Sequence, residues 1–381
     1  MKKVTLTAAM MLAGLATTAA QDDLKLIVGT YTNGTSKGIY TLNFNQATGE
    51  SSPLDTLEVT NPSYLNVSSD GKTIYAVSET NDDKAAVNAI SFDSQTGRMK
   101  LQNSVLTHGA DPCYVETNGN MLLTANYSGG SMSLFPVNLD GSLGEMTAQF
   151  KGSKGGTFAP NQDAPHVHCA TFTPDGSYVL ASDFSNDRIL MYEITGTEQI
   201  KEAGVAGTLA KGSGPRHIVF SPESRYFYVM SELSGDVTAY IWNFAKPRKI
   251  QVIKSDSVGG HGGADIHFSP DGRFLYTSNR LKADGISIYR VNKQTGRLTK
   301  VGYQLTGVHP RNFNITPNGK FLLCACRDSN KIQVFAINAS NGLLEDTGKD
   351  IEIDKPVCVK FYPYVMQPGF GDGQFRIIEK K

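Results

Sequence analysis

The sequence has few of the features that commonly indicate a protein's class. It contains one tryptophan and five cysteines among 381 residues, and its 36 basic residues equal its 36 acidic residues. An odd and unevenly spaced set of cysteines predicts neither a disulfide framework nor a zinc or redox motif. We therefore expect the cysteines to be small buried side chains. A chain without excess charge has no bulk electrostatic reason to bind nucleic acid or a membrane, so we expect neither partner.

Several sequence motifs are also absent. The chain has no GxSxG nucleophile elbow, no GxxxxGK[ST] phosphate-binding loop and no dinucleotide-binding fingerprint. It also lacks the regular WD dipeptides that mark one large group of propeller proteins. These absences argue against a serine hydrolase of the elbow type, a nucleotide-binding enzyme and a WD-type scaffold.

Residues 1–20 have the character of a secretory signal peptide. Lys2 and Lys3 precede an apolar run of small residues that ends in TTAAQ, which is the order of charge, hydrophobic region and cleavage site. The apolar run is short for a membrane span. We expect cleavage after Ala20 and a periplasmic protein, or a cytoplasmic one if the segment is retained. Residues 21–381 are then expected to form a single domain.

The rest of the chain repeats a strand–turn–strand unit. A complete copy is GPRHIVFSPESRYFYVMSEL (Gly214–Leu233), in which a turn separates two runs of β-branched and aromatic residues. We use the term anchor for the position nine residues before the turn glycine or its replacement. A spacing of roughly fifty residues without helical periodicity is typical of four-stranded β-propeller blades, and seven copies predict an all-β, seven-bladed β-propeller. The anchors are Pro62, Val167, Pro215, Gly263 and Pro310; Pro112, in a copy shortened by two residues, and Pro356 hold the same place in less complete copies.

The two ends of the chain complement each other. Three strand-like runs, LIVGTY, GIYTLNF and DTLEV, precede Pro62, whereas only PVCVKFY follows the last turn. The C-terminal run can therefore supply the first strand of a blade whose other three strands come from the N-terminus. Such pairing closes the ring and removes an exposed sheet edge.

Two positions of each blade are expected to meet at one mouth of the central channel. The innermost strand starts where its antiparallel neighbour ends, so the residues after the anchor and after the second strand lie together. Four arginines against two glutamates predict a site for an anionic small molecule, which guanidinium groups can hold with two hydrogen bonds. The candidate site residues are Glu79, His168, Arg216, Glu232, Arg280, Arg311 and Arg327, with His217 next to them.

Other interpretations of these residues remain open. The arginines and glutamates could form structural ion pairs that fill the channel without any ligand. His166 and His168 face the same way on a strand, but a third zinc ligand is not evident, and we predict no metal and no cofactor. The glycine- and proline-rich stretch 151–168 is either a lid over the mouth or a tolerated insertion.

Four segments together carry a family resemblance: VGTYTNGTSKGIY, PHVHCATFTPDG, GPRHIVFSP followed by SEL, and FSPDGRFLYTSNR. In these segments the chain resembles the propeller-type 6-phosphogluconolactonases, a family that includes the fungal carboxy-muconate cyclases. The resemblance covers nearly all of the chain after residue 20. It implies a seven-bladed propeller with the catalytic residues His168, Arg216, Glu232 and Arg280.

The predicted activity is hydrolysis of the ester bond of a small anionic sugar acid lactone. Glu232 and His168 would share the proton transfers, while Arg216 and Arg280 would stabilise the oxyanion. The substrate-binding residues would be Arg311, Arg327, His217 and Glu79. A muconate-type cycloisomerase could use the same groups, and a non-enzymatic propeller that binds an acidic glycan would need only the arginines. We expect a monomer or a weak dimer.

Overall fold

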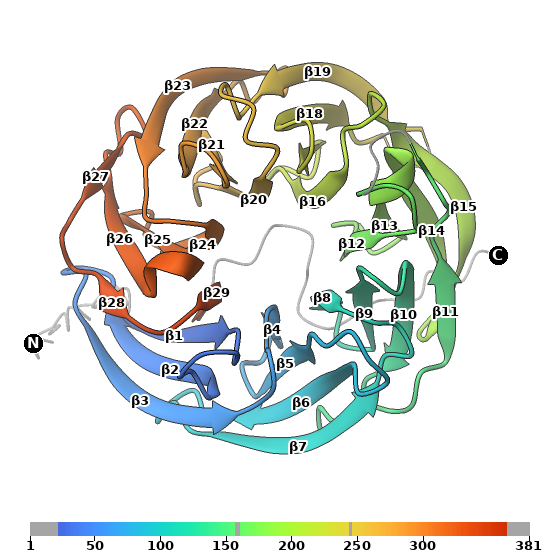
Figure 1. Cartoon of the computed structure of the whole chain (residues 1–381), viewed down its shortest axis with the longest axis horizontal. Helices are drawn as coiled ribbons and strands as arrows, with labels where there is room; N and C mark the ends of the chain where they lie inside the picture. The colour runs from blue at the N-terminus through green and yellow to red at the C-terminus, as the bar shows by residue number, and fades with distance from the viewer. Residues whose placement is uncertain (1–21, 157–160, 244–245, 364–381) are drawn as a thin grey trace, which may run out of the picture.

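The computed structural model describes residues 22–156, 161–243 and 246–363. The predicted signal segment 1–20 lies outside the described residues, as does part of the glycine- and proline-rich stretch before His168. Seven sheets surround a central channel (Figure 1), and each sheet runs outward from the channel to the rim. None of the helices within the described ranges is long and apolar enough to cross a membrane. The fold is the seven-bladed propeller that the repeat predicts.

The innermost strand of each blade begins at or near a predicted anchor. The second strands run antiparallel to them, and most are buried along their whole length because neighbouring blades cover both faces. The innermost strands are β4 (Leu65–Val67), β8 (Pro112–Thr117), β12 (Val167–Phe172), β16 (Pro215–Phe220), β20 (Gly263–Phe268), β24 (Pro310–Ile315) and β29 (Pro356–Tyr362). The second strands are β5 (Thr73–Ser78), β9 (Met121–Asn126), β13 (Tyr178–Asp183), β17 (Tyr226–Ser231), β21 (Phe274–Asn279), β25 (Phe321–Cys326) and β1 (Asp23–Thr30).

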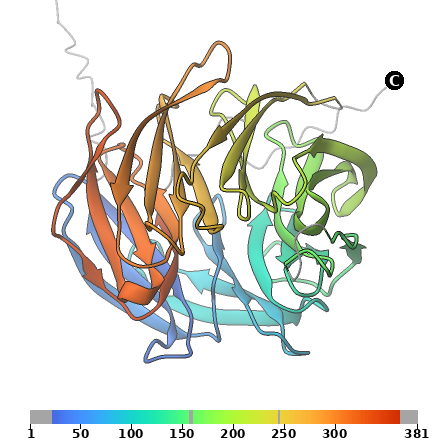
Figure 2. The ribbon, with the colours of Figure 1, turned by 45° about the horizontal axis from the view of Figure 1, so that its top comes forward.

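The fourth strand of a blade lies at the rim, where most of its residues are exposed or partly buried. Figure 2 shows the blades side by side around the ring. The third strands are β2 (Gly38–Asn45), β6 (Ala86–Phe92), β10 (Ser131–Pro136), β14 (Arg188–Gly196), β18 (Asp236–Ile241), β22 (Gly285–Val291) and β26 (Lys331–Ile337). The outer strands are β3 (Ser51–Glu58), β7 (Met99–Leu106), β11 (Ala148–Lys151), β15 (Gln199–Thr208), β19 (Arg248–Lys254), β23 (Leu298–Leu305) and β27 (Leu344–Asp346), with β28 (Ile351–Glu352) also paired to β26.

The ring closes as the sequence predicts. Strand β29 pairs antiparallel with β1, and its sheet has the order β29-β1-β2-β3. Val28 lies opposite Val359 in this ladder, and both side chains are buried. The first and last segments of the propeller therefore share one hydrogen-bonded sheet.

Local sequence explains the turns between first and second strands. These turns need a residue with positive φ, which glycine adopts without steric cost; Gly272 has a φ of 68°. In the blade that begins at β16, Ser224 occupies this position with a φ of 57°. The five cysteines, all within the described ranges, are buried and free of disulfides, as expected.

The innermost strands contain a bulge that the repeat pattern does not reveal. In β16 the pairing shifts between Pro215, which lies opposite Ser231, and His217, which lies opposite Met230. A bulge inserts one extra residue and redirects the side chains next to it. Arg216 and His217, although adjacent in sequence, are both buried at the channel. Because of the bulge, Arg216 contacts Glu232, while the next residue, His217, contacts Asp265 deeper in the channel.

Candidate active site

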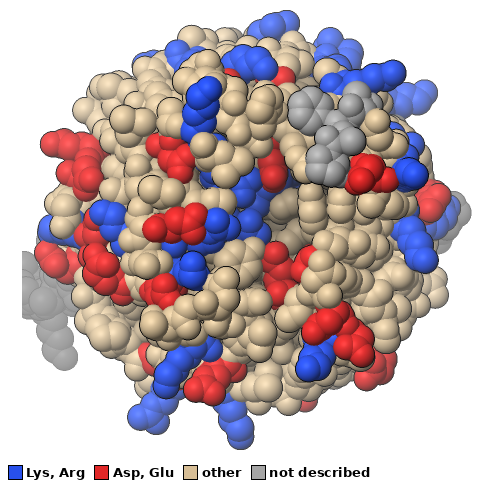
Figure 3. Space-filling view, in the orientation of Figure 1, with Lys and Arg blue, Asp and Glu red and all other residues tan. Residues whose placement is uncertain are grey.

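A cavity of about 190 Å³ lies at the channel mouth where the innermost strands begin. Lys and Arg side chains gather in the hollow at the centre of the face seen in Figure 1 (Figure 3). Five of the eight predicted site residues line this cavity, and the other three, Arg216, His217 and Arg327, do not. The cavity is lined by Glu79, Cys113, Tyr127, His168, Glu232, Arg280 and Arg311.

Glu232 lies between two arginines. The Nε of Arg216 donates a hydrogen bond of 2.9 Å to Oε2 of Glu232, and the guanidinium of Arg280 lies 3.0 Å from the same oxygen. Within the described chain no hydrogen bond reaches Oε1. Burial raises the pKa of Glu232, but the charges of Arg280, Arg216 and Arg311 lower it below its ordinary value overall. Glu232 is therefore an ionised carboxylate with one free oxygen at the cavity.

Arg216 supports Glu232 from beneath the cavity wall. Its side chain is 2% exposed, and its terminal nitrogen donates a 2.7 Å hydrogen bond to the Ala264 carbonyl. The same nitrogen lies 3.3 Å from Nε2 of His217, whose Nδ1 is 2.7 Å from Oδ1 of Asp265. These contacts hold the guanidinium of Arg216 in one orientation. It also places His217 behind the cavity, in the role of a supporting residue rather than a wall residue.

A second carboxylate–arginine pair occupies another part of the wall. Arg311 lies 3.6 Å from Glu79, and the Tyr31 hydroxyl donates to both oxygens of Glu79 at 3.0 and 3.1 Å. The guanidinium of Arg311 also lies 5.2 Å from the centre of the Tyr31 ring, a cation–π contact. Tyr31 directly follows β1, so it occupies the position that Glu79 and Glu232 have in their own blades.

His168 is buried in the cavity wall with 5% of its surface exposed. Burial, together with the charges of Arg216 and Arg311, holds its pKa well below the ordinary value, so the imidazole is neutral at pH 7. Its Nδ1 lies 3.7 Å from the sulfur of Cys113. His166 instead stacks on Tyr127 with 4.2 Å between ring centres. Across the described residues, no three His, Cys, Asp or Glu side chains group so that they could hold a metal ion.

Arg327 does not line the cavity, because its guanidinium pairs with its neighbour Asp328. Its Nε and a terminal nitrogen each lie 2.8 Å from one oxygen of that carboxylate. Three arginines, Arg216, Arg280 and Arg311, therefore face two glutamates at the site. The excess is one positive charge rather than the two that the sequence suggested.

Buried histidines near this mouth predict a strong pH dependence of stability. Burial lowers the pKa of His217 to about 4 and that of His309 to about 2, and it lowers that of His168 as well. The unfolded chain gains protons on these histidines below about pH 6.5, whereas the folded chain does not. Stability is therefore complete above pH 6.5 and falls below it, by up to about 1.4 kcal/mol per pH unit for each histidine. Urea unfolding at pH 7.5 and 5.5 measures the loss.

The matched variants for this experiment are His309→Gln and His108→Gln. His309 is 7% exposed, so its replacement should reduce the slope of unfolding free energy against pH. His108 is exposed, and its replacement should leave the slope unchanged. Equal free energies of unfolding at the two pH values in the unmodified protein would contradict the prediction.

The fold and the site together define the class of this protein. It is a closed seven-bladed propeller, and a small cavity lined by charged side chains lies at one mouth of its channel. Concave sites of this kind are usual places for small-molecule binding. The family described as "Lactonase, 7-bladed beta-propeller" matches residues 25–361. The chain belongs to this lactonase family.

Individual relatives cover nearly the whole chain. The 6-phosphogluconolactonase of Bacillus subtilis is 33% identical over 343 residues, which cover 88% of this chain and 97% of the relative. A protein of known crystal structure from Bacteroides uniformis is 54% identical, with a TM-score of 0.88 over 90% of this chain and all of its own. The periplasmic gluconolactonase of Pseudomonas aeruginosa is 31% identical, with a TM-score of 0.84 over 89% of this chain and 99% of its own.

Proposed function

We propose that the protein hydrolyses the ester bond of a sugar acid lactone in the cavity at the arginine-lined mouth. The observation that carries the proposal is the arrangement of Glu232. It is held ionised by two arginines through one oxygen, its other oxygen is free, and a neutral histidine stands in the same wall. A lactone hydrolase needs a proton acceptor for water, donors for the oxyanion and a proton source for the leaving alkoxide.

The proposed roles follow from these positions. The free oxygen of Glu232 orients water and accepts its proton as the water oxygen attacks the lactone carbonyl. Arg280 and Arg311, which line the cavity, donate to the oxyanion of the tetrahedral intermediate. When the ring C–O bond breaks, the alkoxide takes the proton that Glu232 accepted from water, either directly or relayed by His168. The product acid then ionises and releases one proton to the solvent at neutral pH.

The charge and size of the cavity favour an unphosphorylated lactone. One uncompensated guanidinium matches the single negative charge that develops on the oxyanion, whereas a phosphate dianion would exceed it. A volume of about 190 Å³ lies below the range typical of drug-sized ligands, so it suits one sugar ring better than an oligosaccharide. The names of the relatives, 6-phosphogluconolactonase and gluconolactonase, support a sugar lactone with or without the phosphate.

A periplasmic location is proposed along with this substrate. Residues 1–20 have the order of a signal peptide, and the Pseudomonas relative is described as periplasmic. Mass spectrometry of the protein from its native cell tests the proposal. A form that begins after Ala20 is expected, and an intact Met1 form in the cytoplasm would contradict export.

The activity is tested with a panel of aldonolactones, with and without a terminal phosphate, followed by proton release in weak buffer. We expect release well above the spontaneous rate for glucono-1,5-lactone, with no gain in kcat/KM from the phosphate. A clear preference for the phosphorylated lactone would contradict the charge argument but keep the lactonase proposal. Absence of turnover with every lactone would refute the lactonase proposal.

A further inference from the structure

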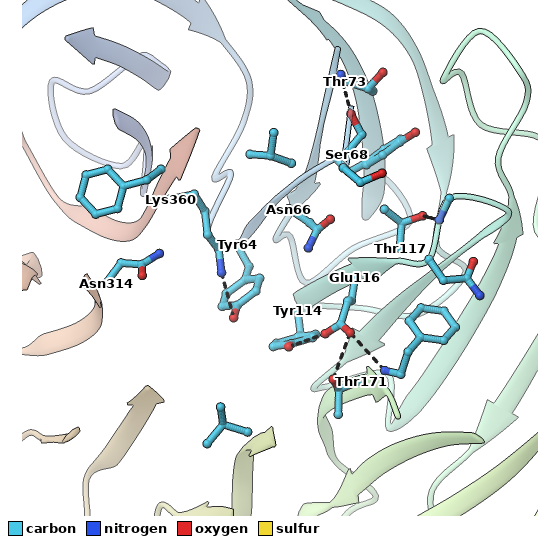
Figure 4. Close-up of a pocket in the computed structure, with 18 of the residues that line it drawn as sticks. Tyr64, Asn66, Ser68, Thr73, Tyr114, Glu116, Thr117, Thr171, Asn314 and Lys360 are labelled. Carbon is cyan, nitrogen blue, oxygen red and sulfur yellow. Dashed lines mark hydrogen bonds between the residues drawn. The ribbon is translucent and has the colours of Figure 1, made fainter. Parts of the chain in front are cut away.

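A second and larger cavity, of about 820 Å³, opens at the other end of the channel. Its inner wall is a ring made by the fourth residue after each anchor, one from every innermost strand. Figure 4 shows several of these side chains directed toward the channel from different blades. The ring consists of Asn66, Glu116, Thr171, Val219, His267, Asn314 and Lys360.

A layer of rings separates this cavity from the proposed active site. Tyr64 stacks on Tyr114 with 4.4 Å between ring centres, and His217 meets the two rings edge-on at 5.6 and 5.5 Å. All three residues are less than 9% exposed. They line the large cavity, and none of them lines the small one. A ligand in the large cavity would therefore occupy a separate site.

Four carboxylates line the large cavity, and each accepts hydrogen bonds from the protein itself; they are Asp70, Glu116, Asp140 and Asp265. Glu116 accepts hydrogen bonds from the Tyr114 hydroxyl at 2.8 Å, the Thr171 hydroxyl at 3.0 Å and the Phe172 amide at 3.1 Å (Figure 4). Burial raises the pKa of Glu116, while the charge of Lys360 acts in the opposite direction. At the floor, Asp265 accepts from His217 and His267. Each of the four carboxylates therefore has hydrogen-bond donors within the protein.

The donors of the ring are less well satisfied. The Lys360 amine lies 3.4 Å from the Tyr64 hydroxyl and 4.5 Å from the centre of its ring. No carboxylate lies within 4.0 Å of that amine among the described residues, and the Asn66 side chain makes no hydrogen bond to any of them. A partly buried ammonium that no carboxylate contacts directly is stabilised when an anion joins it. Among the described residues, the Lys360 ammonium therefore has the Tyr64 hydroxyl as its one side-chain acceptor, and the Asn66 amide has none.

We propose that the large cavity binds a small organic carboxylate. Its carboxylate group would bind Lys360 and Asn66, and its apolar body would lie against the apolar wall that includes Phe220 and Phe268. The cavity volume is within the usual range of small-molecule sites. A charge-assisted hydrogen bond to an ammonium is about twice as strong as a neutral one, so Lys360 is the residue on which affinity should depend most. This proposal is independent of the lactonase activity.

The test is a titration with 4-fluorobenzoate, followed by ¹⁹F NMR, with neutral 4-fluorobenzamide as its matched control. We expect saturable binding of the acid and at least tenfold weaker binding of the amide. Lys360→Met should weaken binding of the acid about tenfold or more, and Lys360→Arg should retain it. Trp242, the one tryptophan of the chain, packs 5.7 Å from the cavity residue Phe220, so its fluorescence should change with the same dissociation constant.

Two controls separate this site from the arginine-lined mouth. Arg311→Met alters only the small cavity, so binding of the acid should persist in that variant. Lys360→Met should hydrolyse lactones as the unmodified protein does and should unfold at the same temperature within a few degrees. Loss of binding in Arg311→Met but not in Lys360→Met would overturn the proposal. Equal binding of acid and amide, or no saturable binding, would overturn it too.

Discussion

Glu232→Gln is expected to lower kcat for lactone hydrolysis by about 10²–10⁴-fold. In the folded protein the amide oxygen can take the place of Oε2 and keep its bonds to Arg216 and Arg280. The amide NH₂ then occupies the place of the free oxygen. An NH₂ group donates hydrogen bonds and cannot accept a proton from water. The variant should therefore bind the lactone but activate water poorly.

The rate of proton release under saturating lactone measures this effect, and the matched control is Glu145→Gln. Glu145 is exposed, so its replacement removes a carboxylate without touching the site and should leave kcat unchanged. His168→Asn provides a second comparison within the cavity. Turnover that survives in both Glu232→Gln and His168→Asn would show that the reaction occurs elsewhere.

Arg216→Met is expected to abolish activity and to lower the free energy of unfolding by about 3–5 kcal/mol. The change leaves Glu232 with one arginine instead of two and removes the donor to the Ala264 carbonyl. Removing one partner of a buried ion pair is costly because the other charge stays in a poorly solvated site. Urea unfolding gives the stability loss, and proton release gives the activity.

The double variant Arg216→Met/Glu232→Gln separates the two effects. Neutralising both partners removes the uncompensated charge, so part of the lost stability should return, while activity should not. An unchanged free energy of unfolding in the single variant would mean that the guanidinium is not needed to stabilise Glu232. Measurable activity in the double variant would contradict the proposed mechanism.

The architecture could be predicted from the sequence because every blade repeats the same local chemistry. The anchors at Pro215 and Pro310 begin β16 and β24, and the run PVCVKFY forms β29 and pairs with β1. Counting from the anchor identified His168 and Arg311, and counting from the turn identified Glu232 and Arg280; all four line the small cavity. Such counting works because position in a blade determines distance from the channel.

Three features of the site could not be obtained by this counting, each for a physical reason. Counting from the turn did not identify Tyr31, because the first two strands of its blade, β29 and β1, come from opposite ends of the chain and no turn joins them. Comparing the residue that directly follows the second strand in every blade would have identified it. His217 lies deeper than expected because the bulge in β16 shifts its register. Arg327 was expected at the site, but Asp328, its neighbour in sequence, competes for the guanidinium.

The pairing of β29 with β1 has a consequence for how the chain acquires its structure during synthesis. Strands β1, β2 and β3 leave the ribosome first, yet the innermost strand of their sheet ends at Tyr362. Bringing together segments so distant in sequence has a large cost in loop-closure entropy, and contacts of this kind slow folding. The nascent protein must therefore carry an incomplete first sheet until almost all of the propeller has been translated.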